Sequence, residues 1–300
     1  MSTTLNNTIL KLIFVFCALI IFFKILNAIW FHYQVFDNTI YFLRTPYIAT
    51  ISALLILVLF KKTDSAFFES ILKLFTLLTF LALSLIACST ILTTPFPLQD
   101  HNIFDIDNAM GMNVIPYILF IKSHQHIAAS FIIIYISLVH VLYLTTLITI
   151  IPGHSKYFYQ LVFFLLISMM AGSVIYYLLP TVGLSSVLPN HHILPVADNI
   201  KIYNQFVKLH SYQAITSFNT GMISFPSFHV LFGLSVVLIF WRIKSLRVPL
   251  ATWQTFITLT TIPIGSHFFL DLPAAYLLGY LVWMATTKLI SEDTDRFTKT

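Results

Sequence analysis

The segment from Gly221 to Asp271 starts with GMISFPSFHV (221–230) and ends with IGSHFFLD (264–271), and two apolar runs joined by a short basic turn lie between these ends. Three of its side chains are ionisable although their surroundings are apolar: His229, His267 and Asp271. An ionisable group inside a bilayer costs about 3 kcal/mol, so such residues usually mark a functional site. We therefore expect the rest of the chain to be organised around these three side chains.

The composition is that of a membrane protein. Of the 300 residues, 58% are hydrophobic and 9% are charged, whereas a soluble domain has about 25% charged residues. The net charge of +5 does not indicate nucleic-acid binding, because Lys and Arg stand singly between apolar runs, as they do when they orient a membrane protein. Cys17 and Cys88 lie inside apolar runs, so we expect free thiols and no cysteine metal site.

Eight apolar runs are candidates for transmembrane helices, which need about 20 residues each. They cover 9–31, 45–60, 71–93, 127–151, 158–180, 227–241, 249–264 and 272–290. We expect the first run to be an uncleaved helix, because no convincing small-residue cleavage site follows it. The predicted fold class is therefore all-α, a polytopic transmembrane helical bundle.

The distribution of Lys and Arg orients this bundle. With the N-terminus in the cytoplasm, the cytoplasmic side carries Lys11, Lys61, Lys62, Lys73, Lys156, Arg242, Lys244, Arg247, Lys288, Arg296 and Lys299. The outer side carries only Arg44, Lys122, Lys201 and Lys208. Both termini are then cytoplasmic, and we expect the membrane to be a bacterial inner membrane or an equivalent cell membrane.

Two long non-apolar loops, 94–126 and 181–225, fall on the outer face in this orientation. The first contains Asp105 and Asp107, which we interpret as solvated loop residues, although they could also bind the hydroxyl groups of an acceptor. In the second, apolar residues at helical spacing over 198–212 predict a short helix at the membrane interface.

The same topology brings the three ionisable side chains together at the outer ends of neighbouring helices. His267 and Asp271 are four residues apart, so they share a face of a helical turn, and an aspartate there would orient the imidazole. His229 could give a proton to a leaving oxygen, and the helix start beside it offers unpaired N–H groups for a phosphate. This combination indicates phosphoryl transfer through a phosphohistidine; the alternative is that the histidines only pack against Tyr and Phe at the interface.

The sequence resembles the type-2 phosphatidic acid phosphatase superfamily. The segments that carry the resemblance are TPFPLQD (94–100), YYLLPTVG (176–183), FPSFH (225–229) and GSHFFLD (265–271). The last two look most similar to the branch that contains the inositol phosphorylceramide synthases. The resemblance covers about 71–290 and implies a six-helix core. We therefore divide the chain into two N-terminal helices, 1–65, and a catalytic membrane domain, 66–300.

By motif position, the resemblance implies that His267 is the nucleophile, Asp271 its orienting partner and His229 the general acid. It also implies that phosphate is held by Ser227 and by nearby groups, for which we select Phe228, Gly265 and Ser266. The superfamily uses no metal ion, and we expect no metal and no other cofactor.

The sequence departs from the superfamily at its basic residues. Thr261 stands where the commonest third motif has an arginine, and the first motif, a Lys followed by an Arg-Pro pair, is not present as such. Lys201 and Lys208 reproduce the spacing of two bases, so we predict that Lys201, Lys208 and His210 supply part of the charge that binds phosphate.

These features predict an integral-membrane lipid phosphatase that removes the terminal phosphate of a phosphatidic-acid-like lipid or an isoprenoid diphosphate on the outer face. One alternative is a headgroup transferase, of the inositol-phosphate type, that uses the same residues. An alternative of another class is a transporter whose three ionisable residues relay protons, which would place such groups at mid-bilayer. The sequence does not indicate an oligomeric state.

Overall fold

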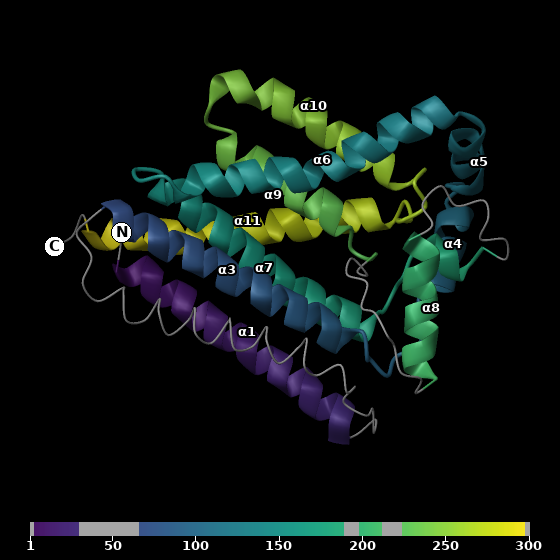
Figure 1. Ribbon diagram of the computed structural model, residues 1–300, viewed down its shortest axis with the longest axis horizontal. Helices are drawn as coiled ribbons and strands as arrows, with labels where there is room; N and C mark the ends of the chain where they lie inside the picture. The colour runs from purple at the N-terminus through teal and green to yellow at the C-terminus, as the bar shows by residue number, and fades with distance from the viewer. Residues whose placement is uncertain (1–2, 30–65, 189–197, 212–223, 298–300) are drawn as a thin grey trace.

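The computed structural model describes residues 3–29, 66–188, 198–211 and 224–297 (Figure 1). Within these ranges every regular element is helical. The long helices are α1 (Thr3–Ile29), α3 (Ala66–Ile91), α6 (Gln125–Ile150), α7 (Ser155–Leu178), α9 (Phe228–Phe240), α10 (Lys244–Thr261) and α11 (Asp271–Phe297). The shorter ones are α4 (Asp100–Ala109), α5 (Ile115–Ser123), the 3-10 turn η1 (Leu184–Ser186) and α8 (Asp198–His210). The predicted helix at 45–60 lies outside the described residues.

The chain forms a transmembrane helical bundle, which confirms the predicted fold class. Four of the described helices, α1, α3, α6 and α7, are long and apolar enough to cross a membrane. The apolar helix α9 is shorter, with 13 residues. Each predicted span in the described ranges corresponds to a helix, although α10 begins at Lys244 rather than at Pro249, because this proline lies inside the helix.

From α3 onward the long helices run along the length of the bundle in alternating directions, and α1 runs in the same direction as α3 (Figure 1). Figure 1 shows that α1 begins and α11 ends at one end of the bundle, whereas α4, α5 and α8 lie at the opposite end. Helix α9 lies centrally and contacts α6, α7, α10 and α11. The starts of α9 and α11 and the end of α10 therefore meet at the end of the bundle that α4, α5 and α8 cover.

Helix α1 packs on α3 and α7 through apolar side chains and buried hydrogen bonds, two of which join it to α7. The hydroxyl of Tyr159 donates to Oδ1 of Asn6 over 2.8 Å, and that of Tyr177 donates to Oδ1 of Asn27 over 2.6 Å. Because a buried amide needs a partner, these two bonds fix the position of α1 along α7.

Helices α4 and α5 correct the prediction of a non-apolar loop over 94–126. They are 10 and 9 residues long, too short to give the apolar periodicity of a spanning helix. Pro116 occupies the first turn of α5, where a missing N–H has no cost. The short helix predicted at 198–212 is confirmed as α8, whereas its position at the membrane interface stays a prediction. Phe206 of α8 is buried in a cluster that includes Tyr176 and Tyr177.

Candidate active site

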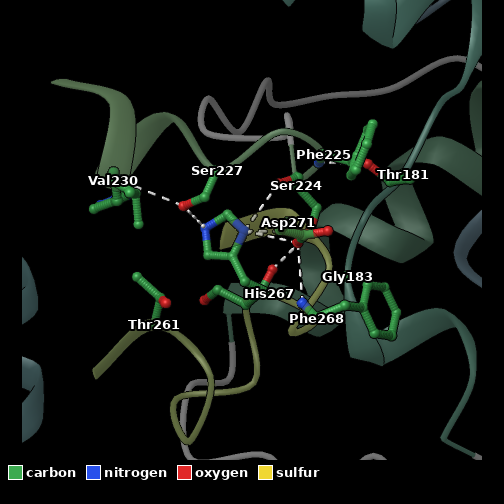
Figure 2. A network of polar contacts seen from close by, with 12 residues as sticks. Thr181, Gly183, Ser224, Phe225, Ser227, Val230, Thr261, His267, Phe268 and Asp271 are labelled. Atoms are coloured by element: carbon green, nitrogen blue, oxygen red, sulfur yellow. Dashed lines mark hydrogen bonds and ion pairs between the residues drawn. The ribbon is translucent and has the colours of Figure 1, made fainter. Parts of the chain in front are cut away.

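His267 lies in the turn between α10 and α11 and is only 3% exposed. Its Nδ1 is 3.0 Å from Oδ2 of Asp271 and 2.9 Å from the carbonyl oxygen of Ser224. A carboxylate and a carbonyl only accept hydrogen bonds, so Nδ1 carries the proton. In the neutral ring the other nitrogen, Nε2, then has the free lone pair, and it lies 3.2 Å from the hydroxyl of Ser227 (Figure 2).

Asp271 is the first residue of α11 and is fully buried. Besides the imidazole of His267, its Oδ2 accepts hydrogen bonds from the backbone N–H of Phe268 and the hydroxyl of Ser224, each over 3.0 Å. These bonds hold the carboxylate in one orientation (Figure 2). The four-residue spacing predicted that His267 and Asp271 meet, and they do so across a turn that leads into the helix.

Ser227 is the N-cap of α9, and its hydroxyl accepts a hydrogen bond from the N–H of Val230. The same hydroxyl can donate its own proton to Nε2 of His267. The next residue, Phe228, has its ring against α7, where a Cβ on Gly172 would lie 2.1 Å from the ring. Helix α9 therefore starts directly beside His267, and its first-turn N–H groups and dipole favour an anion there.

His229 lies in the first turn of α9, and its ring centroid is 6.2 Å from that of His267. It stacks on Tyr135 of α6, with centroids 3.8 Å apart and ring planes inclined by 17°. The hydroxyl of Tyr135 is 3.0 Å from Nδ1 of His229. The structure thus brings His229, His267 and Asp271 together and adds Tyr135, which no motif in the sequence indicated.

Asp107 of α4 holds the turn that follows His267. Its carboxylate accepts the N–H of Phe269 over 2.7 Å and the N–H of Leu270 over 3.0 Å. Our interpretation of Asp107 as a solvated loop residue was therefore wrong: it is buried, and burial raises the pKa of its carboxyl. Asp105, on the same helix, is exposed.

Asp100, at the start of α4, holds a second backbone segment beside the site. Its carboxylate accepts the N–H of Val182 over 3.1 Å and the N–H of Gly183 over 2.7 Å. Burial raises the pKa of this carboxyl to about 7. Gly183 has φ +83°, and a Cβ there would lie 2.7 Å from the carbonyl oxygen of Ser266, so this segment abuts the residue before His267.

Gly265 and Ser266, which were also predicted to bind phosphate, lie in the turn before His267. The N–H of Gly265 donates to the carbonyl of Ile262, and the side chain of Ser266 interacts with the hydroxyl of Tyr135, so both groups already have partners. Thr261, in place of the arginine, is buried near His267, and its hydroxyl donates to the carbonyl of Thr258 (Figure 2).

Three basic residues of α8 were also predicted to bind phosphate. His210 stacks on Phe206 with centroids 3.9 Å apart, and burial lowers its pKa. Lys208 is exposed, and Lys201 lies in the first turn of α8. Their part in binding phosphate stays a prediction.

The residues in the described part of the chain include no group of three or more His, Cys, Asp or Glu side chains arranged to hold a metal ion. In a comparison with known families, residues 101–285, well over half of the chain, match a family described as the PAP2 superfamily. Comparison with curated proteins and with solved structures gives no match.

Proposed function

Because the chain belongs to the PAP2 superfamily, we propose that it is an integral-membrane lipid phosphatase that acts through a phosphohistidine at His267. The observation that carries this proposal is the tautomer of His267. Its Nδ1–H faces two acceptors, Asp271 and Ser224, which leaves the lone pair of Nε2 directed toward the start of α9. An unprotonated imidazole nitrogen held beside an anion-binding helix start is suited to attack phosphorus.

In the first step, Nε2 of His267 attacks the terminal phosphorus of the lipid. A P–N bond forms and the bond between phosphorus and the lipid oxygen breaks. The proton on Nε2 of protonated His229 passes to that oxygen, so the lipid leaves as an alcohol, or as a monophosphate if the substrate is a diphosphate. Asp271 stabilises the positive charge that develops on the His267 ring.

In the second step, water replaces the lipid at the site. Neutral His229 takes one proton from the water as its oxygen attacks phosphorus, and the P–N bond breaks. Inorganic phosphate leaves, His267 returns to its neutral form and His229 is protonated again. The enzyme is then back in its starting state. The roles of His229 in the two steps are reciprocal, as microscopic reversibility requires.

Neutral donors would hold the phosphoryl oxygens in this scheme. The hydroxyl of Ser227 lies beside Nε2 of His267, and the N–H groups of Phe228 and His229 belong to the unpaired first turn of α9. Every residue of the proposed site lies within 66–300, which we take as the catalytic domain.

The positive-inside rule supports a site on the outer face. The described helix ends opposite the site include Lys156, Arg242, Lys244 and Arg247. These bases favour a cytoplasmic position for that end, which also holds the start of α1 and the end of α11 (Figure 1). The substrate would then be a lipid of the outer leaflet of a cell membrane.

The test is to incubate the purified protein with a panel of lipid phosphates, with and without polyol acceptors. The proposal predicts release of inorganic phosphate from phosphatidic acid or an isoprenoid diphosphate, loss of that release in His267→Ala, and full activity in EDTA. A new phosphodiester in place of free phosphate would instead show a headgroup transferase, the activity that the similarity of FPSFH and GSHFFLD to the inositol phosphorylceramide synthase branch suggests.

A further inference from the structure

One tyrosine contacts both halves of the site. Tyr135, on α6, stacks on the ring of His229 and has its hydroxyl 3.0 Å from Nδ1 of that ring. The same hydroxyl also interacts with the side chain of Ser266, the residue before His267. Tyr135 therefore joins the segment FPSFH to the segment GSHFFLD from a helix that belongs to neither.

We propose that Tyr135 is a positioning residue that sets the ring plane and the proton-transferring nitrogen of His229. The proposal rests on the proposed function, in which Nε2 of His229 must exchange a proton with the leaving oxygen and then with water. A phenol can donate to an unprotonated Nδ1 and can accept from Nδ1–H. In either protonation state Nδ1 has a partner, and Nε2 is the nitrogen left for the substrate.

The stacked ring has a separate effect. An aromatic face in contact with an imidazole holds the plane of the ring and attracts its cationic form. The cation of His229 is the form that protonates the leaving oxygen. Tyr135 therefore acts on His229 in two separable ways, through its ring and through its hydroxyl.

The two effects can be separated by substitution. Tyr135→Phe keeps the ring and removes only the hydroxyl, so the packing of α6 on α9 is retained, whereas Tyr135→Leu removes both. Tyr143 provides the matched control: it lies on the same helix and is 62% exposed, so Tyr143→Phe removes a hydroxyl far from the site contacts.

The kinetic test compares two leaving groups. The alkoxide of phosphatidic acid needs a proton as it leaves, whereas 4-nitrophenolate does not, so a defect in proton donation affects only the first substrate. We expect Tyr135→Phe to lower kcat for phosphatidic acid by roughly 10-fold or more and to leave 4-nitrophenyl phosphate turnover nearly unchanged. Tyr143→Phe should change neither. Equal losses on both substrates, or no loss on phosphatidic acid, would overturn the proposal.

A spectroscopic test does not depend on turnover. In protein labelled with ¹⁵N-histidine and held in nanodiscs, the resonances of His229 can be assigned from their loss in His229→Gln. Tyr135→Phe should shift the Nδ1 resonance of His229, and Tyr143→Phe should not; an unmoved resonance would contradict a role for the hydroxyl. If the wild-type protein releases no phosphate from either substrate, the proposed function fails, and this resonance still decides whether Tyr135 controls His229.

Discussion

Oδ2 of Asp271 lies 3.0 Å from Nδ1 of His267, and both residues are almost fully buried. The same oxygen accepts the N–H of Phe268 and the hydroxyl of Ser224, so it cannot turn away from the imidazole without breaking those bonds. This relationship places a proton of His267 on Nδ1, so that in the neutral ring Nε2 has the lone pair that the proposed mechanism uses to attack phosphorus.

Asp271→Asn tests that relationship. An amide of the same shape can present its NH₂ group to Nδ1 and so favour the tautomer that carries the proton on Nε2. We expect kcat for phosphate release to fall roughly 10³-fold or more, as carboxylate-to-amide changes beside catalytic histidines do elsewhere. Asp105→Asn, at an exposed position of α4, should keep full activity. Comparable activity in Asp271→Asn and wild type would mean that Asp271 does not orient the nucleophile.

Asp107→Ala tests the support of the turn that carries His267. The change leaves the N–H groups of Phe269 and Leu270 without their acceptor, and each unsatisfied buried group costs about 1–3 kcal/mol. We expect the free energy of unfolding in detergent to fall by about 2 kcal/mol or more, together with kcat. Asp105→Ala is the control on the same helix, and equal stability of the two variants would contradict the assigned role.

Gly183→Ala tests the contact between the segment held by Asp100 and the residue before His267. A Cβ at Gly183 would lie 2.7 Å from the carbonyl oxygen of Ser266, and φ at this residue is +83°. Gly153 has φ +84° but has open space at its Cβ position. Gly153→Ala is therefore the control, because it introduces the same backbone strain without a steric clash. We expect both variants to lose some stability and only Gly183→Ala to lose most of its phosphatase activity. The activities of the two variants, measured at equal folded fraction, decide the point.

The pH dependence of stability tests the burial of Asp100. Its pKa is raised from the ordinary value of 3.8 to about 7 in the folded protein, mainly by burial. Between pH 3.8 and about 7 the folded state therefore binds more protons than the unfolded state. The contribution of Asp100 to the free energy of unfolding falls as the pH rises through this range. We expect the free energy of unfolding to fall across this window in the wild type and to fall less in Asp100→Asn. Parallel curves for the two proteins would contradict this assignment.

The long helices and the proximity of His229, His267 and Asp271 could be predicted from sequence because their signals are local. An apolar run of sufficient length specifies a spanning helix, and the alternation of such runs places His229, His267 and Asp271 at one end of the bundle. The four-residue spacing of His267 and Asp271 is likewise a local pattern.

The supporting contacts could not be predicted, because they join distant segments. Asp107 bonds to backbone groups more than 160 positions away, and Tyr135 meets His229 from a different helix. A carboxylate that pairs with backbone N–H groups leaves no partner residue in the sequence to recognise, which is why Asp107 was interpreted as solvated. The spacing of Lys201 and Lys208 matched a known pattern of bases, but spacing along a helix does not specify the distance to a site on another element.

The central claim is that the phosphoryl group passes through Nε2 of His267, and direct trapping of that intermediate tests it. The purified protein would be mixed rapidly with phosphatidic acid and quenched in alkali, in which phosphohistidine is stable, and its peptides would be analysed by tandem mass spectrometry. We predict a phosphoryl group on His267 during turnover in the wild type, and neither the modification nor turnover in His267→Ala. A phosphorylated residue other than His267, or phosphate release that persists in His267→Ala, would contradict the account.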